Sequence, residues 1–141
     1  MEKLASPVIF PTTEKIEYHW NNKVVLITED EEVNFFYLKT LLKKTEATVI
    51  RAKNGKEAVD IITRHAGEID LILMDINMPV MDGYEAMRII KSKHPNLPII
   101  AQTAYTLNND RIKCLKAGFN DYIAKPINRV ALFRMVSENL S

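Results

Sequence analysis

The stretch LILMDINMPVMDGYEAMR, residues 71–88, carries the pattern that decides the fold. Its apolar run 71–74 does not alternate with polar residues, which predicts a strand covered on both faces. Asp82 followed by Glu85 resembles a capping box, which marks the start of a helix. The small and apolar residues that follow recur at helical spacing, at Gly83, Ala86, Met87 and Ile90. The stretch therefore predicts a buried strand followed by an amphipathic helix.

The same alternation extends in both directions along the chain. Short apolar runs occur at residues 24–27, 48–50, 71–74, 99–101 and 122–124. Helical patterns separate these runs, and residues 33–43 and 128–140 supply a first and a last helix. Five strands that alternate with five helices predict an α/β fold, a doubly wound five-stranded parallel sheet with helices on both faces.

Residues 1–22 are predicted to be an N-terminal tail or linker, because residues 1–20 lack a clear period and contain two prolines. Residues 23–141 are predicted to form one domain, a length that can bury a single core. The formal net charge of +1 comes without a basic face, so direct nucleic-acid binding is not expected. A single cysteine excludes an internal disulfide and suits a reducing compartment.

Nothing in the sequence predicts insertion into a membrane. No apolar run approaches the ~20 residues that a membrane-spanning helix needs. The first residues, MEKLASPVIFPTTEKIE, contain acids and prolines where a signal peptide has an unbroken apolar stretch. We therefore expect a cytoplasmic protein.

Polar side chains of complementary chemistry stand at the predicted carboxyl ends of four runs. The first run is followed by Glu29 and Asp30, the third by Asp75, the fourth by Thr103 and the fifth by Lys125. In open α/β sheets the binding crevice lies beyond the carboxyl ends of the strands. Each residue alone would be an ordinary turn or cap residue, but together they predict one site at one edge of the sheet.

The charges at this edge indicate a metal and a phosphoryl group. Two carboxylates about 4 Å apart repel by roughly 4 kcal/mol at an effective dielectric constant near 20. Lys125 offers one positive charge against the three acids Glu29, Asp30 and Asp75, so a further cation is expected. Oxygen ligands without His or Cys favour Mg²⁺, which commonly keeps water and phosphate oxygens in its coordination shell.

Each residue then has an expected role. Asp75 can act as a carboxylate nucleophile that forms an aspartyl phosphate. Lys125 and Mg²⁺ would neutralise charge on the phosphoryl oxygens, since phosphoryl transfer depends mainly on positioning and electrostatics. Thr103 could donate its hydroxyl to a phosphoryl oxygen, and Asn77 could offer its backbone carbonyl to the metal.

Four segments resemble, in order and spacing, the signature segments of response-regulator receiver domains. They are VVLITEDEEVNFFYLKTLL (24–42), LILMDINMPVMDGYEAMR (71–88), IIAQTAY (99–105) and AGFNDYIAKPI (117–127). The resemblance covers about residues 23–140, and DINMPVMDG together with the later Lys-Pro dipeptide is its most specific part. It implies a flavodoxin-like strand order, 2-1-3-4-5.

The resemblance implies roles for individual residues. Asp75 would take phosphate from a phosphohistidine, and the domain would catalyse only its own phosphorylation and dephosphorylation rather than act as an enzyme. The residues matched to the metal site are Glu29, Asp30, Asp75 and Asn77, with Glu29 standing where relatives more often have Asp. Thr103 and Tyr122 match the switch positions, and Lys125 matches the invariant amine in a cis peptide bond to proline. Tyr105 lies where side chains influence the lifetime of the phosphate.

The implied partners are proteins. A histidine kinase or histidine phosphotransfer protein would supply the phosphate. A downstream protein or a dimer partner would bind the face made by the fourth helix, the fifth strand and the last helix. With no output domain recognised, the chain is expected to act alone through protein contacts or to be a segment of a hybrid histidine kinase.

Two alternatives belong to other classes. A phosphohydrolase of the haloacid dehalogenase type also uses a strand-end Asp, a Thr, a Lys and Mg²⁺, but its chemistry needs a second Asp two residues after the nucleophile. Asn77 occupies that position here. A receiver fold that never takes phosphate would usually lack the acid pair, the nucleophile or the lysine, and this chain has all three.

Overall fold

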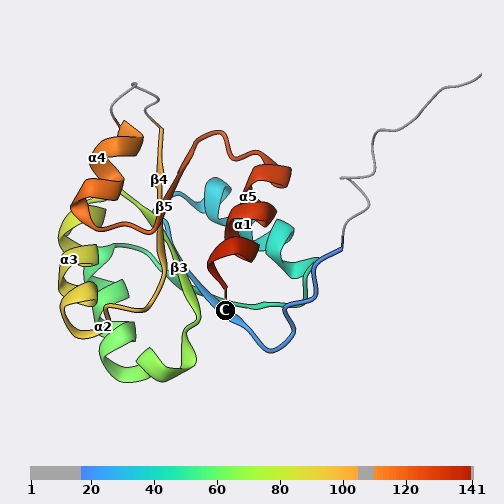
Figure 1. Cartoon of the computed structure of the whole chain (residues 1–141), viewed down its shortest axis with the longest axis horizontal. Helices are drawn as coiled ribbons and strands as arrows, with labels where there is room; N and C mark the ends of the chain where they lie inside the picture. The colour runs from blue at the N-terminus through green and yellow to red at the C-terminus, as the bar shows by residue number, and fades with distance from the viewer. Residues whose placement is uncertain (1–16, 105–109, 141) are drawn as a thin grey trace, which may run out of the picture.

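The structure, a computed structural model, describes residues 17–104 and 110–140. In this part of the chain, strands and helices alternate around one parallel sheet (Figure 1). The strands are β1 (Val24–Thr28), β2 (Thr48–Ala52), β3 (Leu71–Asp75), β4 (Ile99–Thr103) and β5 (Asp121–Ala124). The helices are α1 (Glu32–Lys43), α2 (Gly55–His65), the 3₁₀ turn η3 (Ala66–Glu68), α3 (Gly83–Lys93), α4 (Asp110–Ala117) and α5 (Arg129–Asn139).

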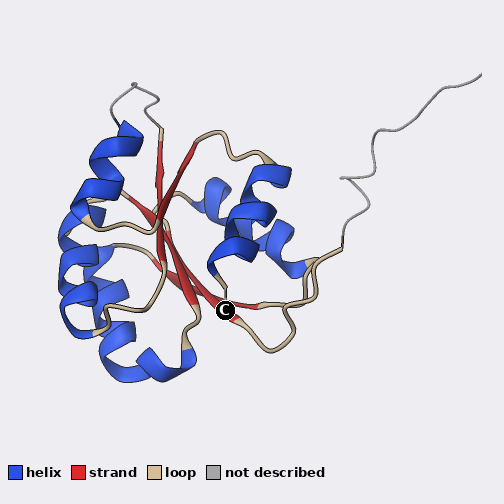
Figure 2. Cartoon of the chain, viewed as in Figure 1, coloured by secondary structure: helices blue, strands red, loops and turns tan. Residues whose placement is uncertain are grey.

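The sheet has the order β2-β1-β3-β4-β5, with all neighbouring strands parallel. Helices α1 and α5 cover one face, and α2, α3 and α4 cover the other (Figure 1). Figure 2 shows the strands of the sheet nearly edge-on between these two groups of helices. The predicted α/β class and the predicted strand order 2-1-3-4-5 are both confirmed.

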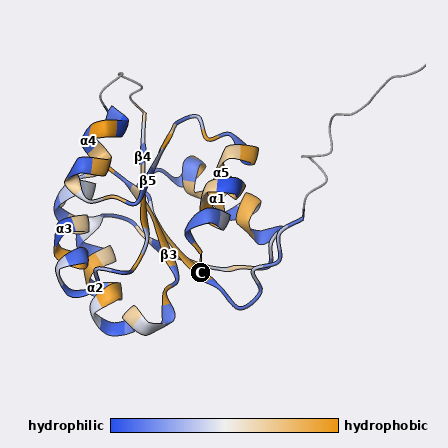
Figure 3. Ribbon diagram, viewed as in Figure 1, coloured by the Kyte–Doolittle hydropathy of each residue, from blue (hydrophilic) through white to orange (hydrophobic). Residues whose placement is uncertain are grey.

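Burial on both faces explains why the central strands are apolar without alternation. All five residues of β3 and all five of β4 are buried. One core cluster lies under α2, α3 and α4 and includes Leu26 and Ile72, while the other lies under α1 and α5 and includes Ile27 and Leu73. Successive strand residues thus enter opposite cores, as the two-residue period of a strand requires. Apolar colour accordingly runs along β3, whereas apolar and polar colour alternate along the helices (Figure 3).

Three of the helices begin at a side-chain cap. Asp82 accepts a hydrogen bond from the backbone N–H of Glu85 at 2.9 Å, which confirms the predicted start of α3. Asn54 and Asn128 cap α2 and α5 in the same way. Helix α1 differs, since its N-cap residue Glu31 makes no capping side-chain hydrogen bond within the described residues.

No helix in the described part of the chain is long and apolar enough to cross a membrane.

An aromatic cluster joins the segment before β1 to α5. Trp20 is buried, and its backbone N–H donates to the carbonyl of Thr45 at 2.7 Å. The rings of Tyr18 and Trp20 both lie against Phe133 of α5, with centroids 5.6 Å and 6.1 Å away. Most of the predicted tail, residues 1–16, lies outside the described residues.

Helix α3 starts unusually close to the end of β3, and glycine makes this possible. A Cβ at Gly83 would lie 2.5 Å from the backbone oxygen of Asp75 and 2.8 Å from the Cα of Ile76. The backbone N–H of Gly83 also donates to the carbonyl of Ile76 at 2.9 Å. Any larger residue would push α3 away from the strand that carries Asp75.

We predict that Gly83→Ala lowers the free energy of unfolding by about 1–3 kcal/mol, since overpacking against backbone atoms cannot relax cheaply. Gly67→Ala is the matched control, because a Cβ there meets no atom within 4 Å. The control should be neutral or stabilise by up to roughly 1 kcal/mol. Urea denaturation of both variants measures the difference, and equal stability of the two would contradict the close approach at Gly83.

Candidate functional site

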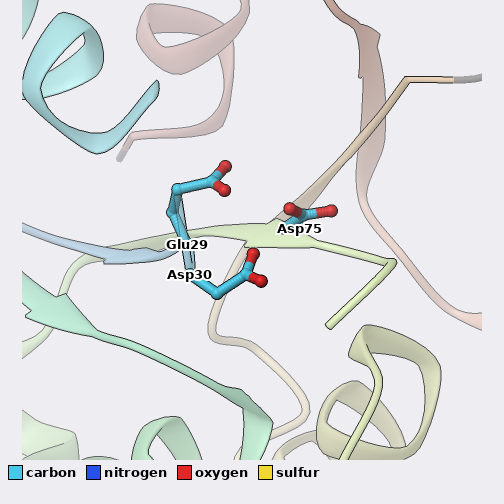
Figure 4. Close-up of side chains that lie close together, drawn as sticks. All are labelled: Glu29, Asp30 and Asp75. Atoms are coloured by element: carbon cyan, nitrogen blue, oxygen red, sulfur yellow. The ribbon is translucent and has the colours of Figure 1, made fainter. Parts of the chain in front are cut away.

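The predicted site residues meet at the carboxyl edge of the sheet. Asp75 is the last residue of β3, Glu29 and Asp30 directly follow β1, and Lys125 directly follows β5. One carboxylate oxygen of Glu29, one of Asp30 and one of Asp75 lie within 4.8 Å of one another. Figure 4 shows the three carboxylates converging on one region of space. The structure therefore brings together the acid cluster that the sequence predicts.

Lys125 bridges two of these acids. Its Nζ lies 3.1 Å from Oδ2 of Asp75 and 3.2 Å from Oε1 of Glu29. Burial alone would lower the pKa of Lys125, but the Asp75 and Glu29 carboxylates outweigh burial and the pKa is raised. The amine therefore stays charged. The Lys125-Pro126 peptide bond is cis, as the resemblance to receivers implied.

Asp75 is a buried carboxylate under opposing influences. Burial raises its pKa most, the Glu29 carboxylate raises it further, and the hydrogen bond from Lys125 opposes both. The resulting pKa is about 6. The backbone N–H of Asn77 donates to Oδ1 of Asp75 at 3.0 Å. At neutral pH the metal-free site therefore holds a carboxylate whose charge the surroundings only partly balance.

Glu29 is fully buried, and both of its carboxylate oxygens already accept hydrogen bonds. Oε1 accepts from Nδ2 of Asn34 at 2.5 Å and also faces Lys125. Oε2 accepts from the backbone N–H of Glu31 at 3.1 Å. Asp30, by contrast, is exposed. The two members of the acid pair thus stand in different surroundings, one inside a hydrogen-bonded network and one open to solvent.

The other predicted residues lie around this cluster. Thr103 is buried at the end of β4, where its register partner is Ala124. Tyr122 lies half-buried on β5, opposite Ala101 of β4. The side chain of Asn77 is exposed, so its link to Asp75 runs through the backbone. The position of Tyr105 is outside the described residues.

Three residues that support the site did not emerge from the sequence. Asn34 of α1 holds the Glu29 carboxylate, and Gln102 of β4 is buried with its Oε1 3.5 Å from Nδ2 of Asn34. Arg51 of β2 donates to the backbone carbonyl of Glu29. Gln102 and Arg51 each interrupt an apolar strand, which is a signal that could have singled them out.

The family model described as "Response regulator receiver domain" matches residues 25–137 of the chain. The chain belongs to this family. The match covers the site and most of both cores, and it is to a signalling domain rather than to a phosphohydrolase. The receiver prediction is therefore confirmed over the phosphohydrolase alternative.

Relatives of this receiver domain include parts of larger proteins. It is 37% identical over 123 residues to the hybrid signal transduction histidine kinase I of Dictyostelium discoideum. That alignment covers 82% of this chain but only 7% of the kinase. This chain thus spans a small part of the length of that curated relative.

Solved receiver structures share its fold. The receiver domain of sensor histidine kinase PA1611 from Pseudomonas aeruginosa, with a magnesium ion coordinated in its active-site cleft, is 39% identical with a TM-score of 0.75. The match covers 83% of this chain and 96% of that one. The Saccharomyces cerevisiae receiver domain of Ssk1, in complex with the histidine phosphotransfer protein Ypd1, is 35% identical with a TM-score of 0.74. It covers 83% of this chain and 88% of that one.

We predict that Asp75→Asn raises the free energy of unfolding of the metal-free receiver at about pH 7.5. The folded pKa of Asp75, about 6, lies above its ordinary value of 3.8, so the folded state binds this proton more tightly than the unfolded state does. The stabilisation that this proton provides is complete below the ordinary pKa and is lost as pH rises through the folded pKa. The variant should therefore lose this part of the pH dependence of unfolding.

Denaturant unfolding in a chelator, at a series of pH values, measures this effect. Asp60→Asn is the control, because Asp60 lies on α2 with a 44% exposed side chain paired to Lys56. We expect the control to match the wild type within about 0.5 kcal/mol. A lower unfolding free energy for Asp75→Asn than for the wild type at neutral pH would contradict the raised pKa.

Proposed function

We propose that Asp75 accepts a phosphoryl group from a phosphohistidine and that the receiver then signals through protein contacts. The observation that carries this proposal is the buried Asp75 carboxylate, flanked by Glu29 and Asp30 and held by Lys125. A nucleophile, a fixed positive charge and acids able to hold a cation thus share one edge of the sheet. Family membership supports the same assignment.

Mg²⁺ is the cation that this donor set suits best. Three carboxylates and one ammonium leave a formal charge of −2, which a divalent ion balances. The donors are oxygens, the ligand type that Mg²⁺ prefers. We expect Asp30, Asp75 and the carbonyl of Asn77 to hold the ion, and Glu29 to reach it through water because its own oxygens already accept hydrogen bonds. The magnesium-bound receiver of PA1611 supports this proposal.

The transfer step needs little from the protein beyond position and charge. An oxygen of Asp75 forms a bond to phosphorus as the phosphorus–nitrogen bond of the phosphohistidine breaks, and the imidazole nitrogen leaves with the electron pair. Mg²⁺ supplies charge neutralisation for the phosphoryl oxygens when it is bound. Lys125 lies close enough to Asp75 to contact an oxygen of the transferred group. Thr103, buried at the end of the neighbouring strand, would donate its hydroxyl to another.

The downstream contact is proposed on the face made by α4, β5 and α5. Tyr122 lies on β5 within this face, and Thr103 lies on the neighbouring strand β4, so a rearrangement of the two side chains would change this face. Large apolar side chains are exposed on both helices, with Ile112 at 53% and Leu115 at 36% on α4 and Val130 at 39% on α5. A protein partner or a second copy of the chain would cover such side chains.

The phosphate donor is proposed to be a histidine kinase or a histidine phosphotransfer protein, and the complex of the Ssk1 receiver with Ypd1 supports the second kind. Similarity to a hybrid kinase and to a response regulator leaves both arrangements of the whole protein open. We place the receiver in the cytoplasm. We also propose that its folded unit extends back to Tyr18 through the aromatic cluster with Trp20 and Phe133, and that residues before it form the tail or linker.

Incubation with a small phosphodonor tests the acceptor directly. We predict that acetyl phosphate and Mg²⁺ place one acid-stable, base-labile phosphate on the wild type, and that Asp75→Asn takes none because it lacks the nucleophile. Intact-protein mass spectrometry measures the added mass. Asp60→Asn, which removes an acid of α2 that is paired to Lys56 and takes no part in the acid cluster, should be labelled like the wild type. Equal labelling of Asp75→Asn and wild type would contradict the assignment.

Phosphorylation should also change the conformation of the face made by α4, β5 and α5, the proposed output face. We predict that backbone amide NMR signals of α4 and β5 shift on phosphorylation, whereas those of α2, away from the strands that carry Thr103 and Tyr122, shift little. Thr103→Ala should keep phosphorylation but reduce the shifts in α4 and β5. Shifts confined to the loops around Asp75 would contradict the proposed output face.

A further inference from the structure

The turn that carries Asp30 is held from β2 by one side chain. Asp30 lies in the middle of residues 29–31, between the end of β1 and the start of α1. It is exposed, and the helix that follows begins without a side-chain cap from Glu31 within the described residues. The Glu31 N–H donates to the Glu29 carboxylate across this turn, so the turn is closed on itself. A contact to the sheet is still needed to fix where the turn presents Asp30.

Arg51 contacts the chain at both ends of this turn. At the first residue of the turn, Nε and Nη2 of Arg51 lie 3.2 Å and 3.0 Å from the backbone carbonyl oxygen of Glu29. After it, Nη1 lies 2.5 Å from Oε1 of Glu32, and the guanidinium sits over the ring of Phe35 at 4.5 Å from its centroid. One planar, multidentate group thus spans the two ends of the turn, an arrangement that lysine cannot reproduce.

The surroundings of Arg51 suit a positioning role. Its side chain is only 14% exposed, although Glu32 is 76% exposed. The same strand also holds the other backbone group of Glu29, whose N–H donates to the carbonyl of Ala52 at 3.0 Å. Both backbone groups of Glu29 are therefore fixed by β2.

We propose that Arg51 is a positioning residue for the cation site, which it serves by holding the turn that presents Asp30 and Glu29. Arg51 itself contacts neither Asp30 nor Asp75 in any hydrogen bond or ion pair recorded among the described residues. This proposal rests on the proposed Mg²⁺ site and adds a residue from β2 to it. Side chains that orient metal ligands commonly affect metal affinity by about 10- to 100-fold.

Positioning and plain electrostatics make opposite predictions for this residue. Removing a positive charge near three carboxylates should by Coulomb's law make cation binding tighter. Loosening the turn that carries Asp30 should make it weaker. The sign of the change in Mg²⁺ affinity therefore separates the two roles.

Calorimetric titration of the full 141-residue chain with magnesium chloride is the test. We expect Arg51→Met, and also Arg51→Lys, which keeps the charge, to weaken Mg²⁺ binding by about 10-fold. Lys53→Met is the matched control, because it removes one exposed positive charge from the segment just after β2. The control should bind Mg²⁺ as tightly as the wild type or slightly more tightly.

Denaturant unfolding in a chelator accompanies each titration, so that affinity is compared only between folded proteins. If folded Arg51→Met and Arg51→Lys bind Mg²⁺ as tightly as the wild type, or more tightly, the positioning role is overturned while the proposed function stands. If Arg51→Met binds weakly but Arg51→Lys binds like the wild type, a single ammonium is enough to hold the turn, and the role assigned to the multidentate guanidinium is overturned. A wild type that binds no Mg²⁺ would instead overturn the proposed function itself.

Discussion

The ammonium of Lys125, lying between the buried carboxylates of Asp75 and Glu29, is the interaction on which the site depends. Without it the edge of the sheet would gather three acids with no fixed counter-charge. With it the charge is still unbalanced, and burial and Glu29 together keep the pKa of Asp75 near 6. A further positive charge beside Asp75 would therefore stabilise the ionised form of its carboxylate. Binding of a cation would in this way favour the charged form of Asp75, which is the form that accepts a phosphoryl group.

The parallel sheet is what makes such a cluster possible. Because β1, β3 and β5 run in the same direction, the residues that follow them arrive at one edge from positions far apart in sequence. Burial of β3 and β4 on both faces fixes this edge in place, and Gly83 lets α3 begin directly against the end of β3. The rigid strands and helices of the chain therefore position a few polar groups.

Sequence reasoning could predict the cluster because strand ends are local features. Asp75, Glu29 and Lys125 each follow an apolar run, and the topology alone brings such residues together. The roles of Arg51 and Asn34 could not be predicted in the same way. Whether Arg51 of β2 reaches the Glu29 carbonyl depends on the register of β2 against β1. Whether Asn34 reaches the Glu29 carboxylate depends on how α1 packs against the sheet. The packing of Trp20 against Phe133 of α5 could not be predicted either, since the two residues are distant in sequence.

The carboxyl ¹³C resonance of Asp75, followed as a function of pH with and without Mg²⁺, tests the central claim most directly. We expect a midpoint near pH 6 in the metal-free receiver, because burial and Glu29 disfavour the charged form more than Lys125 favours it. In Mg²⁺ the midpoint should move to lower pH, since the cation favours the carboxylate. A midpoint near the ordinary value of 3.8 under both conditions would contradict the claim that an unbalanced buried carboxylate underlies the site.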